Sequence, residues 1–389
     1  MRILHVISDL DPAGGGPPLV ASRLAAAQAA LGHRAGLVCY AGPDARERIA
    51  RDLAALPGAD RIELEALRPG GRAERLRAGA GRRVLGRLVG SADIVHLHGV
   101  WDPLLRAAAI TARRARKPYV VAPHGMLDAW ALSEKRLKKR AALALGYRAM
   151  IRGAAFLQAL SAYERDCLVA GGFNASVRVI PNGVFLEELR PLPDPDAFHR
   201  LHPGLAPGRY LLFLARLHPV KGLDLLAEAF ALVAAGHPGA HVVVAGPDFG
   251  ARTSLEAQVA RLGIGDRFRL VGPVYGADKL TALAGALALV LPSKHEGFSM
   301  SIAEALGCAV PVVITRECHF PEVGEVGAGV VVERTVAALA SGLERVLCDP
   351  GAARAMGAAG LELIRAKYTW PAVAERCVNE YGMTAGTGP

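Results

Sequence analysis

The sequence predicts an α/β protein with two doubly wound domains that face each other across a cleft. Its 389 residues exceed the usual length of one domain. Short apolar runs alternate with helical patterns in both halves of the chain, which favours parallel sheets covered by helices. A proline-rich break separates the halves. Open sheets of this type bind ligands beyond the carboxyl ends of their strands, so we expect the functional residues there.

The first half contains short apolar runs with sharp ends, which is the pattern of buried strands. A helical pattern over residues 17–31 follows the first of these runs. The expected strands of the first domain are 3–8, 35–39, 61–64, 94–97, 119–122, 155–159 and 177–180.

The alternation stops at a proline-rich segment and then restarts. Proline does not fit a helix interior or a central strand. Residues 191–208 are therefore expected to link a first domain, 1–190, to a second, 209–366, which a helical segment over 367–389 follows. In the second domain a helix is expected over 223–235. The expected strands are 210–214, 241–245, 267–271, 287–291 and 310–314.

The composition argues against several classes of protein. Although 52% of the residues are hydrophobic, the uncharged stretch 280–293 is shorter than the roughly 20 residues of a membrane-spanning helix. The N-terminus lacks the pattern of a signal peptide, so we expect a cytoplasmic protein. The cysteines form no C-x-x-C pair, which argues against a zinc site. The net charge of +10 favours anionic partners such as nucleotides, nucleic acid or lipid.

Two carboxylates eight positions apart follow the strand expected at 287–291. Glu296 lies in the turn after that strand, and Glu304 lies inside a helix that is expected to begin at Ser299. The first backbone amides of a helix have no intrahelical partners, so they form a site for an anion or a hydroxyl group. The alternative is a capping arrangement with one solvated carboxylate.

Arg216 and Lys221 share the loop that follows the strand expected at 210–214. Two cations ahead of a helix suit a diphosphate, because arginine offers a planar fork of donors and lysine a point charge. The alternative is a pair of solvated loop charges.

Strand ends in the first domain carry glycines and histidines. Gly14, Gly15 and Gly16 form a turn that lets the backbone approach a ligand closely, although their spacing does not match the dinucleotide-binding fingerprint. A plain turn is the alternative. His98 and His124 each precede a glycine just past a strand, so we expect both imidazoles at the edge of the cleft.

In chain order, these motifs resemble those of the retaining GT-B glycosyltransferases of family 4. The resemblance covers nearly the whole chain and is most specific over residues 296–313. Phe185 departs from it, because the family usually has aspartate there. The helix that starts at Trp370 resembles one that crosses back onto the first domain. The motifs are the glycine turn, His98-Gly99, His124-Gly125-Met126, Pro181-Asn182-Gly183, Arg216 with Lys221, and Glu296 with Glu304.

The resemblance implies a role for each of these residues. His124 lies near the reacting sugar, and His98 lies nearer the acceptor. Glu296 and the amides of Phe298 and Ser299 hold the hydroxyl groups of the sugar. The other implied donor-binding residues are Arg216 and Lys221 for the diphosphate, Gly15 and Gly16 for the phosphates or the sugar, and Glu304 for the ribose.

The resemblance also implies transfer, with retention, from a nucleotide-sugar donor to a glycan or lipid-linked acceptor in polysaccharide or glycolipid biosynthesis. The nucleotide sugar is a substrate, so no cofactor is expected. Two D-x-D triplets, at 9–11 and 194–196, are not interpreted as metal sites. Arg216, Lys221 and a helix N-terminus would stabilise the leaving diphosphate, a role that a divalent metal has in other transferases.

Two basic stretches, 68–87 and 133–152, have the composition of amphipathic helices that lie on an anionic membrane surface. The alternative is a solvated helix face. A nucleotide-sugar epimerase on the same fold is a second interpretation of the chain. A nucleic-acid-binding protein is a third, but no aromatic stacking platform is evident, so we expect no nucleic-acid partner.

Overall fold

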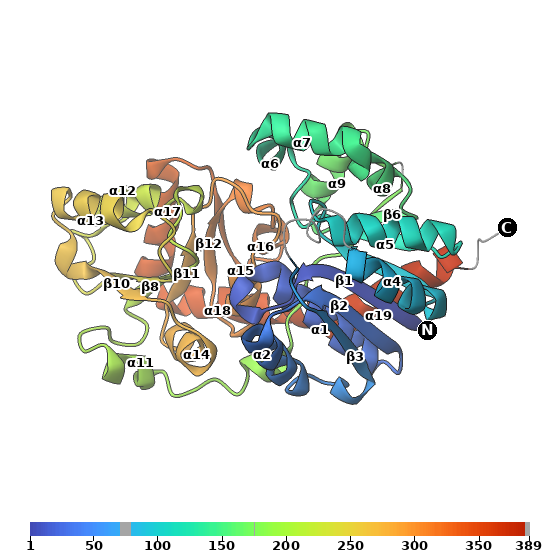
Figure 1. Cartoon of the computed structure of the whole chain (residues 1–389). Coiled ribbons are helices and arrows are strands. Elements are labelled where there is room, and N and C mark those ends of the chain that lie inside the picture. The colour runs from blue at the N-terminus through green and yellow to red at the C-terminus, as the bar shows by residue number, and fades with distance from the viewer. Residues whose placement is uncertain (71–78, 175, 386–389) are drawn as a thin grey trace. The chain divides into compact units, whose positions relative to one another are not determined.

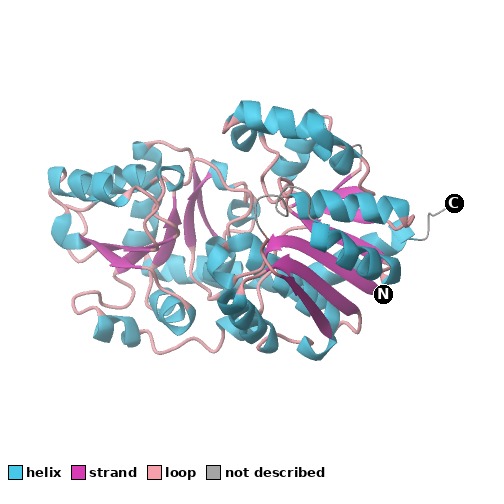
Figure 2. Cartoon of the chain, in the orientation of Figure 1, coloured by secondary structure: helices cyan, strands magenta, loops and turns pink. Residues whose placement is uncertain are grey.

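The computed structural model describes residues 1–70, 79–174 and 176–385, and the chain forms two compact units. The N-terminal unit comprises Met1–Gly183 and Trp370–Pro389, and the C-terminal unit comprises Val184–Thr369. Each unit contains one sheet of parallel strands (Figure 1). Helices surround both sheets (Figure 2). The α/β class and the two doubly wound sheets predicted from the sequence are therefore confirmed.

The sheet of the N-terminal unit has the strand order β3-β2-β1-β4-β5-β6-β7. Its strands are β1 (Arg2–Asp9), β2 (Arg34–Tyr40), β3 (Ile62–Leu67), β4 (Ile94–His98), β5 (Tyr119–Ala122), β6 (Phe156–Ala159) and β7 (Val177–Val179). The helices described around it are α1 (Gly16–Ala30), α2 (Pro43–Ala54), α4 (Gly79–Ser91), α5 (Pro103–Arg114), α6 (Ala129–Ser133), α7 (Arg136–Ala142), α8 (Arg148–Arg152), α9 (Ala162–Ala170) and α19 (Trp370–Ala385), with a π-helical segment at Leu143–Tyr147.

Helix α19 completes the N-terminal unit although it comes from the end of the chain. It packs against α1, and its Tyr381 is fully buried and stacks on Phe156 of β6. Helix α1 begins directly after Gly15, because Gly15 has a φ of 98° and Pro17 and Pro18 fit the first turn of a helix.

The sheet of the C-terminal unit has the order β10-β9-β8-β11-β12-β13. Its strands are β8 (Tyr210–Leu214), β9 (His241–Ala245), β10 (Phe268–Gly272), β11 (Ala288–Leu291), β12 (Val312–Thr315) and β13 (Gly329–Val332). The helices are α10 (Leu186–Leu189), α11 (Asp196–Leu201), α12 (Leu223–Val233), α13 (Arg252–Arg261), α14 (Gly276–Ala284), α15 (Met300–Gly307), α16 (Glu322–Glu325), α17 (Val336–Cys348) and α18 (Pro350–Lys367).

The segment 191–208 differs from the linker expected there. It contains α11, and its Phe198 and Leu205 are buried in the core of the C-terminal unit. The units divide after Gly183 and Thr369, several residues before 190 and a few after 366. The physical reason is that apolar residues between the prolines pack against the C-terminal sheet. Strand β13 was not expected.

Arg72, Arg75 and Arg77 of the basic stretch 68–87 lie outside the described residues. Among the helices that the structure describes, none has both the length and the apolar character needed to cross a bilayer.

Candidate active site

In both units the order of the sheet reverses next to its first strand, between β1 and β4 and between β8 and β11. Ligands of doubly wound sheets bind at such switch points, outside the carboxyl ends of the strands. Arg216 and Lys221 follow β8, and Glu296 follows β11, so the structure places these three residues at the switch point of the C-terminal unit. His98 ends β4, at the switch point of the N-terminal unit.

The loops after β8 and β11 are held together by backbone contacts. The Lys294 N–H donates to the Val220 carbonyl at 2.7 Å. Gly222 has a φ of 72°, and a Cβ atom there would lie 2.0 Å from the Pro292 carbonyl oxygen. Only glycine permits this approach, so the sequence fixes how closely the two loops pack.

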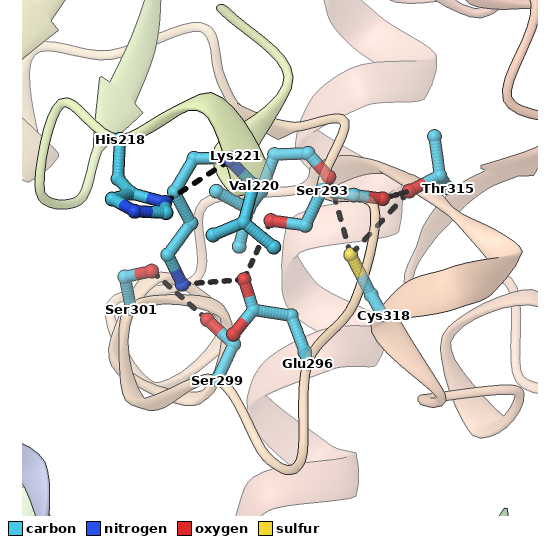
Figure 3. A network of polar contacts seen from close by, with 10 residues as sticks. His218, Val220, Lys221, Ser293, Glu296, Ser299, Ser301, Thr315 and Cys318 are labelled. Atoms are coloured by element: carbon cyan, nitrogen blue, oxygen red, sulfur yellow. Dashed lines mark hydrogen bonds and ion pairs between the residues drawn. The ribbon is translucent and has the colours of Figure 1, made fainter. Parts of the chain in front are cut away.

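This packing brings Lys221 and Glu296 together (Figure 3). Lys221 Nζ lies 2.6 Å from Glu296 Oε1, and their side chains are 14% and 8% exposed. Ser293 Oγ donates to the same Oε1 at 2.5 Å. The Ser293 carbonyl in turn accepts from Thr315 Oγ1 at 2.7 Å. The two residues that sequence analysis placed in different motifs therefore form one buried ion pair.

The hydrogen bonds of the Glu296 side chain to Lys221 and Ser293 both go to Oε1. Within residues 1–70, 79–174 and 176–385, no partner is found for its Oε2. One oxygen of the carboxylate is therefore fixed by the protein, and the other is available to a ligand hydroxyl group.

Glu304 lies on α15 and does not share the Lys221 contact. Its Oε1 pairs instead with Nζ of Lys279 on α14 at 2.8 Å, and both side chains are partly buried. The two carboxylates of the motif thus each have their own lysine. Lys279 was not found from the sequence, because no motif links it to Glu304.

Ser299 precedes the first residue of α15, as the sequence predicts, but its hydroxyl group does not cap the helix. It lies 3.1 Å from Ser301 Oγ instead. The Phe298 ring packs against Phe320 and Tyr368, with centroids 5.5 and 5.9 Å away. Phe298 can therefore offer a ligand its backbone amide rather than its side chain.

Arg216 is exposed, and its guanidinium lies 5.0 Å from the ring centroid of Phe249. Phe249 is itself 51% exposed. A guanidinium on an aromatic face retains its in-plane N–H groups for an anion.

In the N-terminal unit, four imidazoles gather on β1, on β4 and in the turn after β5. His5 of β1 and His98 of β4 share a hydrogen bond of 2.9 Å, and His98 Nδ1 lies 3.2 Å from His124 Nε2. The rings of His96 and His98 stack with centroids 4.3 Å apart. Parallel pairing of β1 with β4 sets His5 opposite His96, which explains the cluster.

His98 is 3% exposed, and both of its ring nitrogens are in hydrogen bonds to other histidines. In this arrangement its side chain contacts other histidines through both nitrogens, and its place on the acceptor side stays a prediction.

His124 occupies a strained turn after β5. Its φ is 52°, and that of Gly125 is 75°. The buried Glu164 holds this turn, because its carboxylate accepts from the Gly125 N–H at 2.7 Å and from the Leu160 N–H at 2.8 Å. Backbone strain of this kind persists only where the surroundings impose it and is concentrated at functional sites.

Burial keeps these imidazoles neutral. It lowers the pKa of His5 and that of His124 to about 4 each, with the hydrogen bond to Gln28 opposing the shift at His5. Burial, together with neighbouring imidazoles, lowers the pKa of His96 and of His98 well below the usual value.

His5, His96 and His98 each place a ring nitrogen within 4.8 Å of the others, a spacing that suits a metal ion. However, His5 and His98 already use their nitrogens to bond each other, Gln28 and His124. A metal ion would have to displace these bonds, so the donor set fits hydrogen bonding better.

Gly15 precedes α1 with a φ of 98°, and a Cβ atom at Gly15 or at Gly16 would contact nothing within 4 Å. The backbone conformation of Gly15 therefore disfavours a side chain there. At Gly16 neither the conformation nor the available space does so. The open surroundings leave room for a ligand against the backbone.

Sequence analysis missed His5, Gln28, His96 and Tyr381, which belong to the same cluster of contacts as His98. A histidine inside the first apolar run and the H-x-H pattern of β4 were available signals, because residues two apart on a strand share a face. Gln28 and Tyr381 lie on helices, and the sequence carries no signal for their position against the sheet.

Two family models match most of the chain. Residues 15–183 match "Glycosyl transferase 4-like domain", and residues 203–362 match "Glycosyl transferases group 1". A D-inositol 3-phosphate glycosyltransferase from Kineococcus radiotolerans is 30% identical over 74% of this chain and 71% of the relative. A GDP-mannose:cellobiosyl-diphosphopolyprenol alpha-mannosyltransferase from Xanthomonas campestris is 26% identical over 76% of each chain.

Solved structures agree in fold. Anabaena Alr3699/HepE in complex with UDP and glucose has a TM-score of 0.78 at 20% identity, covering 98% of this chain and all of the other. With the family matches, this likeness shows that the chain belongs to the group 1 glycosyltransferases of family 4 and is an enzyme of the hexosyltransferase type with the GT-B fold.

Proposed function

We propose that the protein transfers a sugar, with retention of anomeric configuration and without a metal ion, from a nucleotide diphosphate sugar to a glycan or lipid-linked acceptor. The product would belong to polysaccharide or glycolipid biosynthesis. The observation that carries the proposal is the Lys221–Glu296 pair at the switch point of the C-terminal unit.

Glu296 suits a sugar because its Oε1 is fixed by Lys221 and Ser293 while Oε2 accepts from a sugar hydroxyl group. The amides of Phe298 and Ser299 add donors at the start of α15. Lys221 has three N–H donors and uses one on Glu296, so the others serve a phosphate oxygen. Glu304, held by Lys279, is the residue proposed for the ribose.

Metal independence rests on the cations of the C-terminal unit. Breaking a sugar–phosphate bond builds negative charge on the leaving diphosphate. Arg216, Lys221 and the amides that begin α15 can stabilise that charge. Transfer measured in excess EDTA should therefore equal transfer in Mg²⁺ within about twofold, whereas a loss that only a divalent ion restores would reject this part of the proposal.

In the N-terminal unit, His124 is the residue proposed to lie beside the reacting sugar, and Gly15 and Gly16 are proposed to face the phosphates or the sugar. The strained turn at His124 supports this role, as does the open space around the two glycines. NMR of the product tests retention, because the one-bond C–H coupling at the new anomeric carbon reports its configuration, which must be that of the donor.

The donor and acceptor classes follow from the relatives, which are named for an inositol phosphate, a GDP-mannose donor and a polyprenol-linked acceptor. A screen of UDP-, GDP-, ADP- and TDP-sugars by thermal shift tests the donor. A donor at about 100 times its Kd adds roughly 2.7 kcal/mol of stability. No shift with any nucleotide sugar would contradict the proposal.

A peripheral position on an anionic membrane, on its inner face, is proposed from α6, α7 and the segment that follows. Trp130, Leu137 and Leu145 are 46%, 81% and 71% exposed. Exposed cations lie between them at Lys135, Arg136, Lys138 and Arg140. Basic amphipathic surfaces of this kind bind anionic lipid.

Co-sedimentation with vesicles tests this surface. The protein should sediment with vesicles that contain anionic phosphatidylglycerol and stay in solution with phosphatidylcholine alone. Leu137→Ser with Leu145→Ser should weaken sedimentation. Leu232→Ser is the control, because Leu232 is 64% exposed on α12 of the C-terminal unit. Equal sedimentation of all forms would remove the membrane proposal.

A further inference from the structure

A continuous chain of hydrogen bonds runs from His124 into the core of the N-terminal unit. His124 Nε2 contacts His98 Nδ1 at 3.2 Å, and His98 Nε2 contacts His5 Nδ1 at 2.9 Å. His5 Nε2 then contacts Gln28 Oε1 of α1 at 2.8 Å. Three imidazoles therefore separate the side chain of Gln28 from whatever His124 contacts outside the core.

Gln28 gives this chain a direction, because the two ends of its amide differ. Its Oε1 can only accept, and it faces His5. Its Nε2 donates to the Tyr381 hydroxyl group on α19 at 3.4 Å. Tyr381 in turn lies 2.7 Å from His96 Nδ1, so that its hydroxyl group has an acceptor.

The position of each proton along the hydrogen-bond chain follows from Gln28 Oε1 at its inner end. Since Gln28 Oε1 accepts, His5 must donate from Nε2, and a neutral His5 then accepts at Nδ1. His98 must therefore donate from Nε2 and accept at Nδ1. His124 must in turn donate from Nε2, which leaves the lone pair on its Nδ1.

These proton positions require that each ring carries a single proton. Burial meets this condition, because it lowers the pKa of all three imidazoles, and His5 is fully buried. A charged His5 would donate from both nitrogens. The direction of the His5–His98 bond and of the His98–His124 bond would then be reversed. Turning the Gln28 amide around would likewise reverse every bond as far as His124.

We propose that Gln28 is a positioning residue that sets the tautomer of His124 through His5 and His98. The consequence is a lone pair on His124 Nδ1, for which no partner is found within residues 1–70, 79–174 and 176–385. An imidazole in this form accepts a hydrogen bond from a hydroxyl group. The catalytic use of that acceptor rests on the proposed function, in which His124 lies beside the reacting sugar.

Tyr381 supports the orientation of Gln28. It accepts from Gln28 Nε2, and with His96 in its Nε2–H form it donates to His96 Nδ1, so the amide orientation that presents Oε1 to His5 leaves both ends of the amide and the hydroxyl group with partners. Without the amide oxygen or this hydroxyl group, the hydrogen bonds between His124 and Gln28 would no longer prefer one direction.

The test reads the proton positions directly. Long-range ¹H–¹⁵N correlation spectra of the ligand-free protein, labelled with ¹⁵N-histidine, distinguish a protonated ring nitrogen from a bare one. His124→Gln assigns the His124 signals by their loss. The wild-type protein should show His124 protonated at Nε2 and bare at Nδ1. The reverse pattern would overturn the proposal.

Gln28→Leu removes the acceptor that fixes the chain, so the Nδ1–H form of His124 should reach a detectable fraction. Tyr381→Phe should shift the same population in the same direction, and it decides the matter if Gln28→Leu does not fold. Ser22→Ala is the control, because Ser22 is buried on the same helix and its hydroxyl group donates to Leu19 and Asp52 rather than to an imidazole. An unchanged His124 in a folded variant would overturn the proposal.

Kinetics separate this inference from the proposed function. In Gln28→Leu, kcat should fall by roughly tenfold, the effect of one misdirected hydrogen bond, with the KM for the donor little changed. If the spectra show a shifted tautomer while kcat does not change, the hydrogen-bond chain is supported but the role of His124 in transfer is rejected. A tautomer that does not shift would reject the chain whatever the enzyme transfers.

Discussion

The carboxylate of Glu296 divides its two oxygens between two tasks. Lys221 and Ser293 hold Oε1, and Oε2 is left for a ligand. A buried ion pair contributes little net stability, because desolvation offsets the attraction, but it fixes both groups in one geometry. The pair is therefore better understood as a device for positioning than as a source of stability.

Glu296→Gln should retain the fold and lower kcat by about 10²–10³-fold, because it removes a charged partner of Lys221 and a strong acceptor for the sugar. Glu333→Gln is the matched control: Glu333 pairs with Arg316, and both side chains are exposed. Initial rates with the donor found by thermal shift provide the measurement. Wild-type turnover in Glu296→Gln would reject the assigned role.

The buried histidines predict how stability depends on pH. Burial depresses the folded-state pKa of His5 to about 4, below its unfolded value of 6.5. The unfolded chain therefore takes up the proton first, and stability is complete above pH 6.5 and falls as the pH drops towards 4. The loss from His5 alone is about 3 kcal/mol.

Urea unfolding between pH 7.5 and 4.5 measures this dependence. His5→Gln should unfold with a shallower dependence on pH over that range, because one of the depressed groups is gone. A slope equal to that of the wild-type protein would contradict the assignment.

Among the structural elements, the loops after β8 and β11 depend on a single glycine. Gly222→Ala should cost about 3 kcal/mol or more, since the new Cβ atom would meet the Pro292 carbonyl oxygen and the backbone would keep a positive φ. Gly276→Ala is the control, because Gly276 also has a positive φ of 51° but nothing within 4 Å.

Thermal unfolding and donor binding should separate these two variants. Gly222→Ala should lose both stability and donor binding, while Gly276→Ala should lose only about 1 kcal/mol of stability. Similar behaviour in the two would show that the close approach at Gly222 has no special importance.

How much the sequence revealed depended on the element. β5, β8 and β9 were predicted to the residue, because each is a short, buried and mainly apolar run. β13 was not predicted, because its apolar run is short and glycines precede it. Lys221 and Glu296 could be proposed from the sequence because they follow strand ends, whereas Gln28, Lys279 and Tyr381 lie on helices whose rotation against a sheet only the fold determines.

For the molecule as a whole, the last helix is part of the first unit. Ending the chain after Thr369 should therefore destabilise the N-terminal unit, which would lose Tyr381 from its core, and leave the C-terminal unit folded. Removing one buried aromatic side chain already costs about 3–5 kcal/mol.

Limited proteolysis with mass spectrometry checks this expectation. Cleavage should spread through residues 1–183 and spare 184–369. A chain that ends after Thr384 is the control, because it retains the buried part of α19. Resistance of residues 1–183 in the shorter chain would contradict the assignment of α19.

The contact between His96 and Tyr381 joins residues 285 positions apart. On a ribosome, the whole of Val184–Thr369 emerges between the first sheet and the helix that closes it. At roughly 5–20 residues per second, that delay is on the order of 10–40 s. During this interval His96 on β4 lacks its hydrogen-bond partner Tyr381, so the second unit synthesised is the first that can finish folding.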